Sequence, residues 1–413
     1  MITKLKKVLL SGTSRDSFIS LAGSAGMAAG GMLFTILMAR SLNPSEFGIF
    51  SALTATVILL ASIGDFGLSS SLINFIPKLK NNRSEIISVI FWSQLTLAII
   101  LASLLLIASN FKEFIIPGST FIQFVAIAAL VFVYIMEEFP MSVLQADKKF
   151  IPVALFRLAD SFIKISILSL LFIQNKITIE IGIVATLISA GIIAILATRL
   201  ETKNIRPIFP KIYFKKIFHF TKWIALNRTF GVAVSRVDII LLAALASPFA
   251  AGIFSAAARF GLVFTLIVSS LGNVTTPRFS VFNKKEQIKE YLKKLLILIT
   301  IVIIGAVILA IFAKPLILFV FGDKYIQAIP VFQALTLAMI PFIYSIATTG
   351  PLIYSLGKPN FVAFVTIIQV ITLIILDLIL IPTYGVFAPP IAMGISNLFV
   401  LIITGIKLRS LLK

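Results

Sequence analysis

The feature that most constrains the fold of this chain is a series of apolar runs, each long enough to cross a lipid bilayer. Of the 413 residues, 59% are hydrophobic and only 13% are charged. Soluble domains have about 45–50% apolar and about 25% charged residues, whereas a membrane helix needs roughly 20 apolar residues in succession. We therefore predict an all-α, polytopic membrane protein.

The chain contains twelve such runs, and we expect each to form a transmembrane helix. They span residues 17–39, 47–70, 85–109, 121–144, 152–173, 178–198, 222–244, 249–271, 292–313, 328–349, 360–381 and 386–406. Residues 1–16 are short and basic, and we expect them to form an amphipathic segment at the membrane surface, with a cleaved signal peptide as the alternative.

The distribution of positive charge supports this count. Twelve spans place both termini on one side of the membrane, and most of the 36 lysines and arginines fall in the loops of that side. The opposite loops hold only Arg40, Lys112, Lys176, Lys314 and Lys324. Because cytoplasmic loops are enriched in Lys and Arg, we place both termini in the cytoplasm and the chain in the cytoplasmic (inner) cell membrane. The net charge of +20 then reflects topology, and no nucleic-acid partner is expected.

An internal repeat indicates how the helices are organised. Residues 37–52 read LMARSLNPSEFGIFSA, and residues 241–256, at an offset of 204, read LLAALASPFAAGIFSA. A duplicated membrane hairpin is typical of transporters built from two repeats, with the site between them. We expect two six-helix lobes with two-fold pseudo-symmetry around a central cavity. Their predicted bounds are 1–200 and 222–413, joined by a basic cytoplasmic linker at 201–221 with a short interfacial helix near residues 213–220.

Small residues crowd the first span, where Gly26 and Gly30 form a GxxxG pair. Such a pair allows two helix backbones to approach closely in lipid. We interpret it as a tight packing face, with a helix that bends or slides during transport as the functional alternative.

Charged residues inside the predicted spans are the best candidates for a functional site, because charges are costly in a bilayer. Span seven carries Arg228, Arg236 and Asp238, and span eight carries Arg259. Only Asp238 is near in sequence to neutralise the three arginines, and Arg236 and Arg259 have similar predicted depths. Guanidinium groups suit phosphate oxygens, so we favour anion binding by these arginines over structural pairing.

A second charged group lies on spans four and five. Arg157, Asp160 and Lys164 share one helical face, and Glu137 and Glu138 lie at a similar depth. The three residues could form a self-neutralising ladder, and Glu137 and Glu138 could pair with Arg157. Such structural pairing and the lining of a cavity remain equal alternatives.

Five stretches of the chain read MARSLNPSEFGIF, GDFGLSSSLINFIPK, AGIFSAAARFG, FGDKYIQA and LIPTYGVFAPPIAMGISN. They resemble the polysaccharide flippases of bacteria and archaea, the Wzx-like polysaccharide biosynthesis proteins of the multidrug/oligosaccharidyl-lipid/polysaccharide exporter superfamily. The resemblance covers nearly the whole chain. It implies two six-helix lobes and translocation of a polyprenyl-diphosphate-linked oligosaccharide, including O-antigen precursors, from the inner to the outer leaflet by alternating access. It also implies a cation-lined cavity, which Arg228, Arg236 and Arg259 would match, and polymerase or glycosyltransferase neighbours.

Other functions are less consistent with the sequence. A drug or cation antiporter of the same fold would need carboxylates such as Asp65 and Asp377 in the cavity, against the excess of arginine. A membrane glycosyltransferase or polymerase acting on the same lipid carrier usually needs large external loops, which are absent. The chain has no cysteine and a single histidine, His219, so we expect no metal site, no cofactor and no enzymatic activity.

Overall fold

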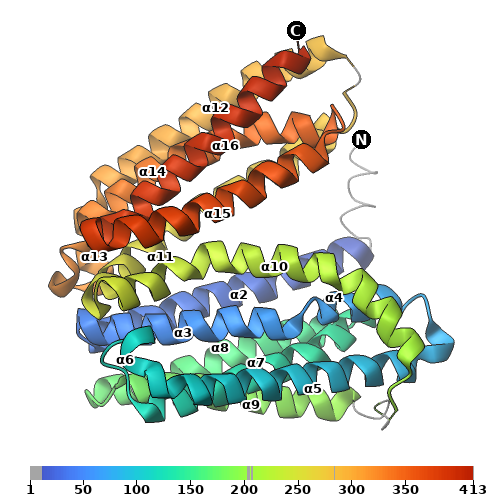
Figure 1. Cartoon of the computed structure of the whole chain (residues 1–413), viewed down its shortest axis with the longest axis vertical. Helices are drawn as coiled ribbons and strands as arrows, with labels where there is room; N and C mark the ends of the chain where they lie inside the picture. The colour runs from blue at the N-terminus through green and yellow to red at the C-terminus, as the bar shows by residue number, and fades with distance from the viewer. Residues whose placement is uncertain (1–11, 202–204, 206–207, 283, 413) are drawn as a thin grey trace. The chain divides into compact units, whose positions relative to one another are not determined.

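The computed structural model describes residues 12–201, 205, 208–282 and 284–412 (Figure 1), and the basic segment predicted at 1–16 lies mostly outside them. Over these residues the chain is helical, with no strand. The α-helices are α2 Gly12–Ser41, α3 Pro44–Asp65, α4 Leu68–Phe75, α5 Arg83–Ala108, α6 Lys112–Ile115, α7 Phe121–Ala146, α8 Phe150–Ile173, α9 Ile179–Glu201, α10 Lys211–Leu245, α11 Pro248–Phe279, α12 Lys285–Ile311, α13 Ala313–Phe321, α14 Ala328–Tyr354, α15 Pro359–Tyr384 and α16 Ala388–Leu412.

Within this described part of the chain, nine segments are long and apolar enough to cross a membrane, which supports the polytopic fold. They are Ala22–Ser41, Pro44–Asp65, Arg83–Ile115, Phe121–Ala146, Ile179–Leu200, Pro248–Phe279, Lys285–Ile311, Ala328–Tyr354 and Pro359–Leu412. The last segment covers both α15 and α16, and α8 and α10 are not among the nine. Both of these helices carry three or more charged residues, which lowers their apolar character.

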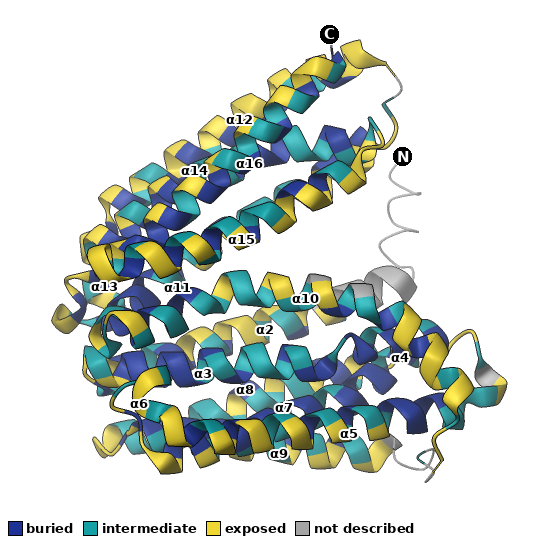
Figure 2. Cartoon of the chain, viewed as in Figure 1, coloured by how far each residue is buried: buried dark blue, intermediate teal, exposed yellow. Residues whose placement is uncertain are grey.

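The exposed side chains of α12 agree with a lipid-facing surface. Ile297, Ile301 and Ile304 are exposed on this helix, whereas Leu295 and Ile299 are buried. Figure 2 shows exposed residues along the length of α12. Apolar residues that face outward along a whole helix are compatible with hydrocarbon but unfavourable in water.

The described residues within Met1–Asn43 and Ile49–Arg236 form one compact unit, and those within Pro44–Gly48 and Val237–Lys413 form another. We call them unit 1 and unit 2. The division between them falls inside α10, after Arg236.

In unit 1, α2 packs closely against α8, beside which it runs in Figure 1. A Cβ atom at Gly26 would lie 2.2 Å from Leu158 Cδ2, and one at Gly30 would lie 2.5 Å from Ser161 Cβ. The tight packing face predicted from the GxxxG pair is therefore confirmed. A methyl group at Gly30 would overlap the Cβ atom of Ser161, and one at Gly26 would require the end of the Leu158 side chain to move.

The helix expected near residues 213–220 is present, but it is not a separate interfacial element. It forms the first turns of α10, which continues without a break to Leu245. Ile217 is buried in an apolar cluster with Leu72 and Phe139, and the ring of Phe220 contacts that of Phe75 edge-on at 5.3 Å. The aromatic and branched residues of this stretch hold it in the core of unit 1.

In unit 2, the two copies of the repeated hairpin contact each other reciprocally. A Cβ atom at Gly48 would lie 1.7 Å from the carbonyl oxygen of Pro248, and one at Gly252 would lie 1.9 Å from that of Pro44. Each glycine thus faces the carbonyl group of the proline that begins the other helix, α11 or α3.

The segment Pro44–Gly48 makes further contacts in unit 2. The ring of Phe47 meets that of Tyr325 edge-on at 5.8 Å, and both residues are buried. Burial lowers the pKa of the neighbouring Lys324, and the carboxylate of Glu46 opposes that shift. These contacts explain why a short piece of α3 belongs to unit 2.

The reciprocal contact generates a prediction for the two glycines. We expect Gly48→Ala and Gly252→Ala each to reduce the amount of folded protein severely, because the added methyl group would overlap a backbone oxygen that cannot move independently. The measurement is the monodisperse fraction on size-exclusion chromatography after detergent extraction.

The matched controls are Gly191→Ala and Gly305→Ala. Both glycines lie inside helices and have open space where a Cβ would be, so alanine there should leave stability unchanged or raise it by up to about 1 kcal/mol. Normal yields of the Gly48 and Gly252 variants would contradict the close contact.

Candidate functional site

The sequence GDFG, residues 64–67, ends α3 with a sharp break. Asp65 is the last residue of α3, and α4 begins at Leu68. Between them Phe66 and Gly67 have positive φ values of 44° and 71°. Glycine adopts this conformation without strain, so Gly67 ends the helix that the sequence predicted to continue to residue 70.

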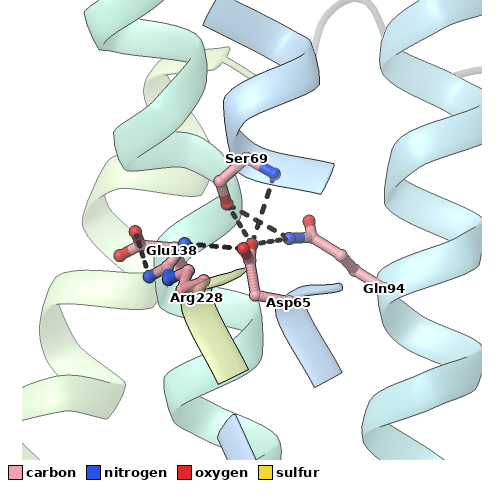
Figure 3. A network of polar contacts seen from close by, with 5 residues as sticks. All are labelled: Asp65, Ser69, Gln94, Glu138 and Arg228. Atoms are coloured by element: carbon pink, nitrogen blue, oxygen red, sulfur yellow. Dashed lines mark hydrogen bonds and ion pairs between the residues drawn. The ribbon is translucent and has the colours of Figure 1, made fainter. Parts of the chain in front are cut away.

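The break places the side chain of Asp65 over the first turn of α4. Its Oδ1 atom accepts hydrogen bonds from the backbone N–H of Ser69 (3.2 Å), from the Ser69 hydroxyl and from Nε2 of Gln94 on α5 (3.0 Å), as Figure 3 shows. A carboxylate is favoured at a helix N-terminus, where the backbone N–H groups lack partners. Asp65 thereby joins α3, α4 and α5.

The second carboxylate oxygen of Asp65 binds an arginine from a distant part of the sequence. Nη1 of Arg228 on α10 lies 2.6 Å from Asp65 Oδ2, and its Nη2 lies 3.4 Å from Oε1 of Glu138 on α7 (Figure 3). The Asp65 side chain is only 3% exposed. The ion pair therefore compensates a charge that would be costly to leave buried alone.

Two glycines of the GDFG sequence allow the neighbouring helices to come this close. A Cβ atom at Gly64 would lie 2.2 Å from Ile135 Cδ1 on α7, and one at Gly67 would lie 3.2 Å from the Ala225 backbone nitrogen on α10. Arg228 follows Ala225 by three residues, about one helical turn. The motif thus allows α7 and α10 to pack close to the carboxylate of Asp65, which lies between the two glycines in the sequence.

The charged residues of α8 form a separate cluster in unit 1. Lys164 Nζ lies 2.6 Å from Asp160 Oδ2, and Ser189 Oγ donates to Asp160 Oδ1 at 2.7 Å. Arg157 Nη1 donates to the Ser24 hydroxyl at 3.1 Å. Asp160 is thus paired with Lys164, one of the contacts of the ladder that the sequence suggested.

The glutamates of α7 divide between the two clusters. Glu137 lies within electrostatic range of Asp160, Lys164 and Arg157. Of the two glutamates that the sequence suggested as partners for Arg157, Glu138 instead contacts Arg228. The reason is geometric, because adjacent residues of a helix project about 100° apart and so face different neighbours.

Unit 2 contains a buried pair of acids. Asp238 on α10 is 2% exposed, and it lies within electrostatic range of Asp377 on α15, which is fully buried. Neither oxygen of Asp377 accepts a hydrogen bond from a described residue. Two neighbouring carboxylates repel each other when both are ionised.

The three predicted anion-binding arginines differ in their surroundings. Arg228 is paired as described above. Arg236, eight residues further along α10, is half-buried and makes no hydrogen bond or ion pair with any residue that the structure describes. Arg259 is half-buried on α11. Arg228 and Arg236 are about 12 Å apart along the helix axis, at 1.5 Å per residue.

Sequence reasoning missed the partners of Arg228 and of Asp238. Asp65 and Arg228 are separated by 163 residues, and Asp238 and Asp377 lie on α10 and α15. The break at GDFG was not predicted, and no local pattern indicates which helix packs against it. Over the residues that the structure describes, no group of three or more His, Cys, Asp or Glu side chains is placed to hold a metal ion.

The contrast between two arginines of α10 generates a prediction. Arg228→Ala should destabilise the protein by about 3 kcal/mol, the lower end of the range for breaking a buried pair, because the Arg228 side chain is itself 39% exposed. Arg236→Ala, on the same helix, should cost much less. Thermal unfolding of the purified variants in detergent measures both.

A double variant provides the internal control. Adding Asp65→Ala to Arg228→Ala removes the uncompensated carboxylate and should recover part of the lost stability. Equal unfolding temperatures for the Arg228 and Arg236 variants would contradict a stabilising role for the ion pair.

Comparisons with known proteins agree with this architecture. A curated relative, the probable low-salt glycan biosynthesis flippase Agl15 of Haloferax volcanii, is 21% identical over 395 residues, covering 94% of this chain and 81% of the relative.

Solved structures share the fold at low sequence identity. The lipid II flippase MurJ in an inward closed conformation has a TM-score of 0.76 and 16% identity over 95% of this chain and 87% of MurJ. A MOP superfamily transporter from Pyrococcus furiosus has a TM-score of 0.60 and 15% identity over 97% of this chain and 95% of that transporter. An outward-facing multidrug resistance MATE transporter has a TM-score of 0.62 and 14% identity over 97% of this chain and 95% of its own length.

Residues 37–330, well over half of the sequence, match the family described as polysaccharide biosynthesis protein. The matched range includes the GDFG break and all the charged residues of unit 1 described above, from Asp65 to Arg228. The chain therefore belongs to the polysaccharide biosynthesis protein family.

Proposed function

We propose that this protein is a flippase that moves a lipid-linked oligosaccharide across the membrane for the assembly of cell-surface polysaccharide. The support is its family membership, together with the flippase named as its relative and the lipid II flippase that shares its fold. The headgroup sugars and a polyprenyl diphosphate would cross from the inner to the outer leaflet, by alternating access. A polymerase or glycosyltransferase acting on the same lipid carrier is the proposed functional neighbour.

The proposed topology has twelve spans in two six-helix lobes, with both termini in the cytoplasm. We assign the spans to α2, α3, α5, α7, α8, α9, α10, α11, α12, α14, α15 and α16. This assignment adds α8 and α10 to the apolar helices. Their charged residues are tolerated because Asp160 is paired with Lys164 and Asp65 with Arg228, which lowers the cost of crossing lipid. The lobes correspond to residues 1–200 and 222–413, joined by the segment at 201–221, whose residues from Lys211 on form the first turns of α10.

The proposed substrate chemistry rests on Arg236, which has no compensating acidic partner among the described residues. An arginine within a membrane helix is costly unless its charge is compensated, and the described residues offer Arg236 no such partner. A diphosphate or an acidic sugar would supply the missing negative charge, and the guanidinium fork can bind two phosphate oxygens at once. We propose that Arg236 binds the anionic part of the substrate, with Arg259 contributing from α11.

Arg228 has a different proposed role. Its bonds to Asp65 and Glu138 hold α10 in unit 1, and its 39% exposed side chain can still present a positive charge to the substrate. We therefore propose Arg228 as a secondary contact for the anion and a structural residue, and Arg236 as the primary contact. Arg157, Asp160, Lys164, Glu137 and Asp238 remain candidates for cavity lining or pairing.

The topology generates a prediction for reporter fusions. Fusions after Pro210, which precedes α10, and after Lys413 should both report a cytoplasmic location, because twelve spans with a linker after the sixth place both points on the inner side. Alkaline phosphatase and green fluorescent protein activities at each site measure this. A fusion after Asn175, between α8 and α9, is the control and should report the opposite side.

The substrate chemistry generates a prediction for Arg236. In a strain lacking its own flippase, Arg236→Ala should lower surface polysaccharide about tenfold or more, because a hydrogen bond to a charged group contributes roughly 1.5–3 kcal/mol. Arg236→Lys should be intermediate, since lysine keeps the charge but lacks the planar fork. Arg259→Ala and Arg259→Lys should follow the same order.

Protein abundance must be measured beside polysaccharide in each strain. The control is Arg278→Ala, which removes an exposed arginine at the end of α11 and should leave export unchanged. Export by Arg236→Ala at the wild-type rate, or lost only in proportion to abundance, would refute the anion-binding role.

A further inference from the structure

Unit 2 contains a pocket that none of the preceding functions uses. It has a volume of about 330 Å³ and is lined by residues of α12, α14 and α16: Lys289, Thr348, Gly405, Leu408, Arg409 and Leu412. Pockets that bind small molecules occupy roughly 300–1,000 Å³. The pocket is therefore large enough for the headgroup of a lipid or a small anion.

Close packing of α14 and α16 forms one wall of the pocket. The hydroxyls of Thr348 and Thr404 are 2.7 Å apart, which joins the two helices. Gly405 follows Thr404 and has no side chain, so the space beside Thr348 stays open; a Cβ there would lie 3.9 Å from Thr348 Cγ2. Leu408 and Leu412 are buried and give the pocket an apolar floor.

Two cations from different helices line the same pocket. Lys289 lies in the second turn of α12 and Arg409 in the last turn of α16, and both are exposed. Neither forms an ion pair with a carboxylate in the described part of the chain. By contrast, Lys294 on α12 is paired with Glu290 at 2.7 Å. The positive charge at the pocket is thus left for a ligand.

The position of the pocket selects the kind of anion. It lies where α12 begins and α16 ends, at the boundary between charged residues and the apolar length of both helices. A soluble phosphate would neutralise the two cations but would make no apolar contact with Leu408 and Leu412. A phospholipid has both parts, because its phosphate can meet the cations while the start of its acyl chains covers the leucines.

We propose that this pocket binds an anionic phospholipid of the surrounding leaflet, with its phosphate held by Lys289 and Arg409. The lipid is a structural ligand of unit 2, distinct from the transported glycan lipid. It stabilises the helix ends by neutralising two cations that have no acidic partner among the described residues.

The test is a thermal-shift titration of the full-length protein in detergent with phosphatidylglycerol, and with zwitterionic phosphatidylcholine for comparison. Phosphatidylglycerol should raise the Tm of the wild-type protein in a saturable manner, and phosphatidylcholine should not. The variant Lys289→Ala/Arg409→Ala should weaken the apparent affinity roughly 30-fold, because each basic residue at an anionic surface contributes a factor of about five.

The matched control is Lys293→Ala/Lys407→Ala. It removes the same charge from the same two helices, but from positions outside the pocket. It should retain the wild-type response to phosphatidylglycerol. If both double variants lost the same affinity for phosphatidylglycerol, the lipid would be attracted by the general positive charge and not by this pocket. That result would overturn the proposal.

A further titration with inorganic phosphate separates the two sources of the anion. If phosphate alone produced the same saturable rise in Tm as phosphatidylglycerol, the pocket would be a site for a soluble anion and the lipid assignment would be wrong. No rise with either ligand would also refute it. The pocket variants keep Arg228, Arg236 and Arg259, so failure of this proposal leaves the proposed transport function untouched.

Discussion

The ion pair between Asp65 and Arg228 is the interaction on which the arrangement of unit 1 depends. A buried carboxylate in an apolar helix bundle is unfavourable by several kcal/mol unless a cation and hydrogen-bond donors surround it. Asp65 receives both, from Ser69, Gln94 and Arg228. Because these partners lie on α4, α5 and α10, one side chain sets the positions of three helices around the end of α3.

The same helix that supplies this structural arginine also carries the proposed substrate arginine. Arg228 and Arg236 have the same charge and lie on one helix, yet the first has two acidic partners and the second has none that the structure describes. Compensated charges stabilise a membrane protein, whereas an uncompensated one favours a ligand of opposite sign. This difference in surroundings, and not the residue type, separates the two proposed roles.

Much of the fold follows from local properties of the sequence. Apolar runs of about 20 residues indicated the helices, and Gly26 and Gly30 indicated the close contact of α2 with α8, because each of these signals acts over a few turns. The break at Gly67 was missed, since a single glycine within an apolar run also occurs in unbroken helices. The length of α10 was underestimated because its first turns are basic. These turns nevertheless pack against unit 1 through the apolar side chains of Ile217 and Phe220.

The candidate site was predictable only in part. Sequence identified Arg228, Arg236 and Arg259 as unusual, because charge in an apolar run is visible without any structure. It could not identify Asp65 as the partner of Arg228, or Asp377 as the neighbour of Asp238, since these contacts depend on which helices pack together. The repeated glycines at Gly48 and Gly252 were recognised as a duplication, but their reciprocal contact with Pro248 and Pro44 required the structure.

The most direct test of the central claim uses the purified protein in liposomes that contain a labelled polyprenyl-diphosphate oligosaccharide on both leaflets. A membrane-impermeant glycosidase added outside removes the label from the outer leaflet at once, and from the inner leaflet only after translocation. A flippase should allow the reaction to pass the half-way point towards completion, while protein-free liposomes stop at half. A reaction that stops at half with folded protein present, or a chemically altered lipid-linked glycan, would contradict this account.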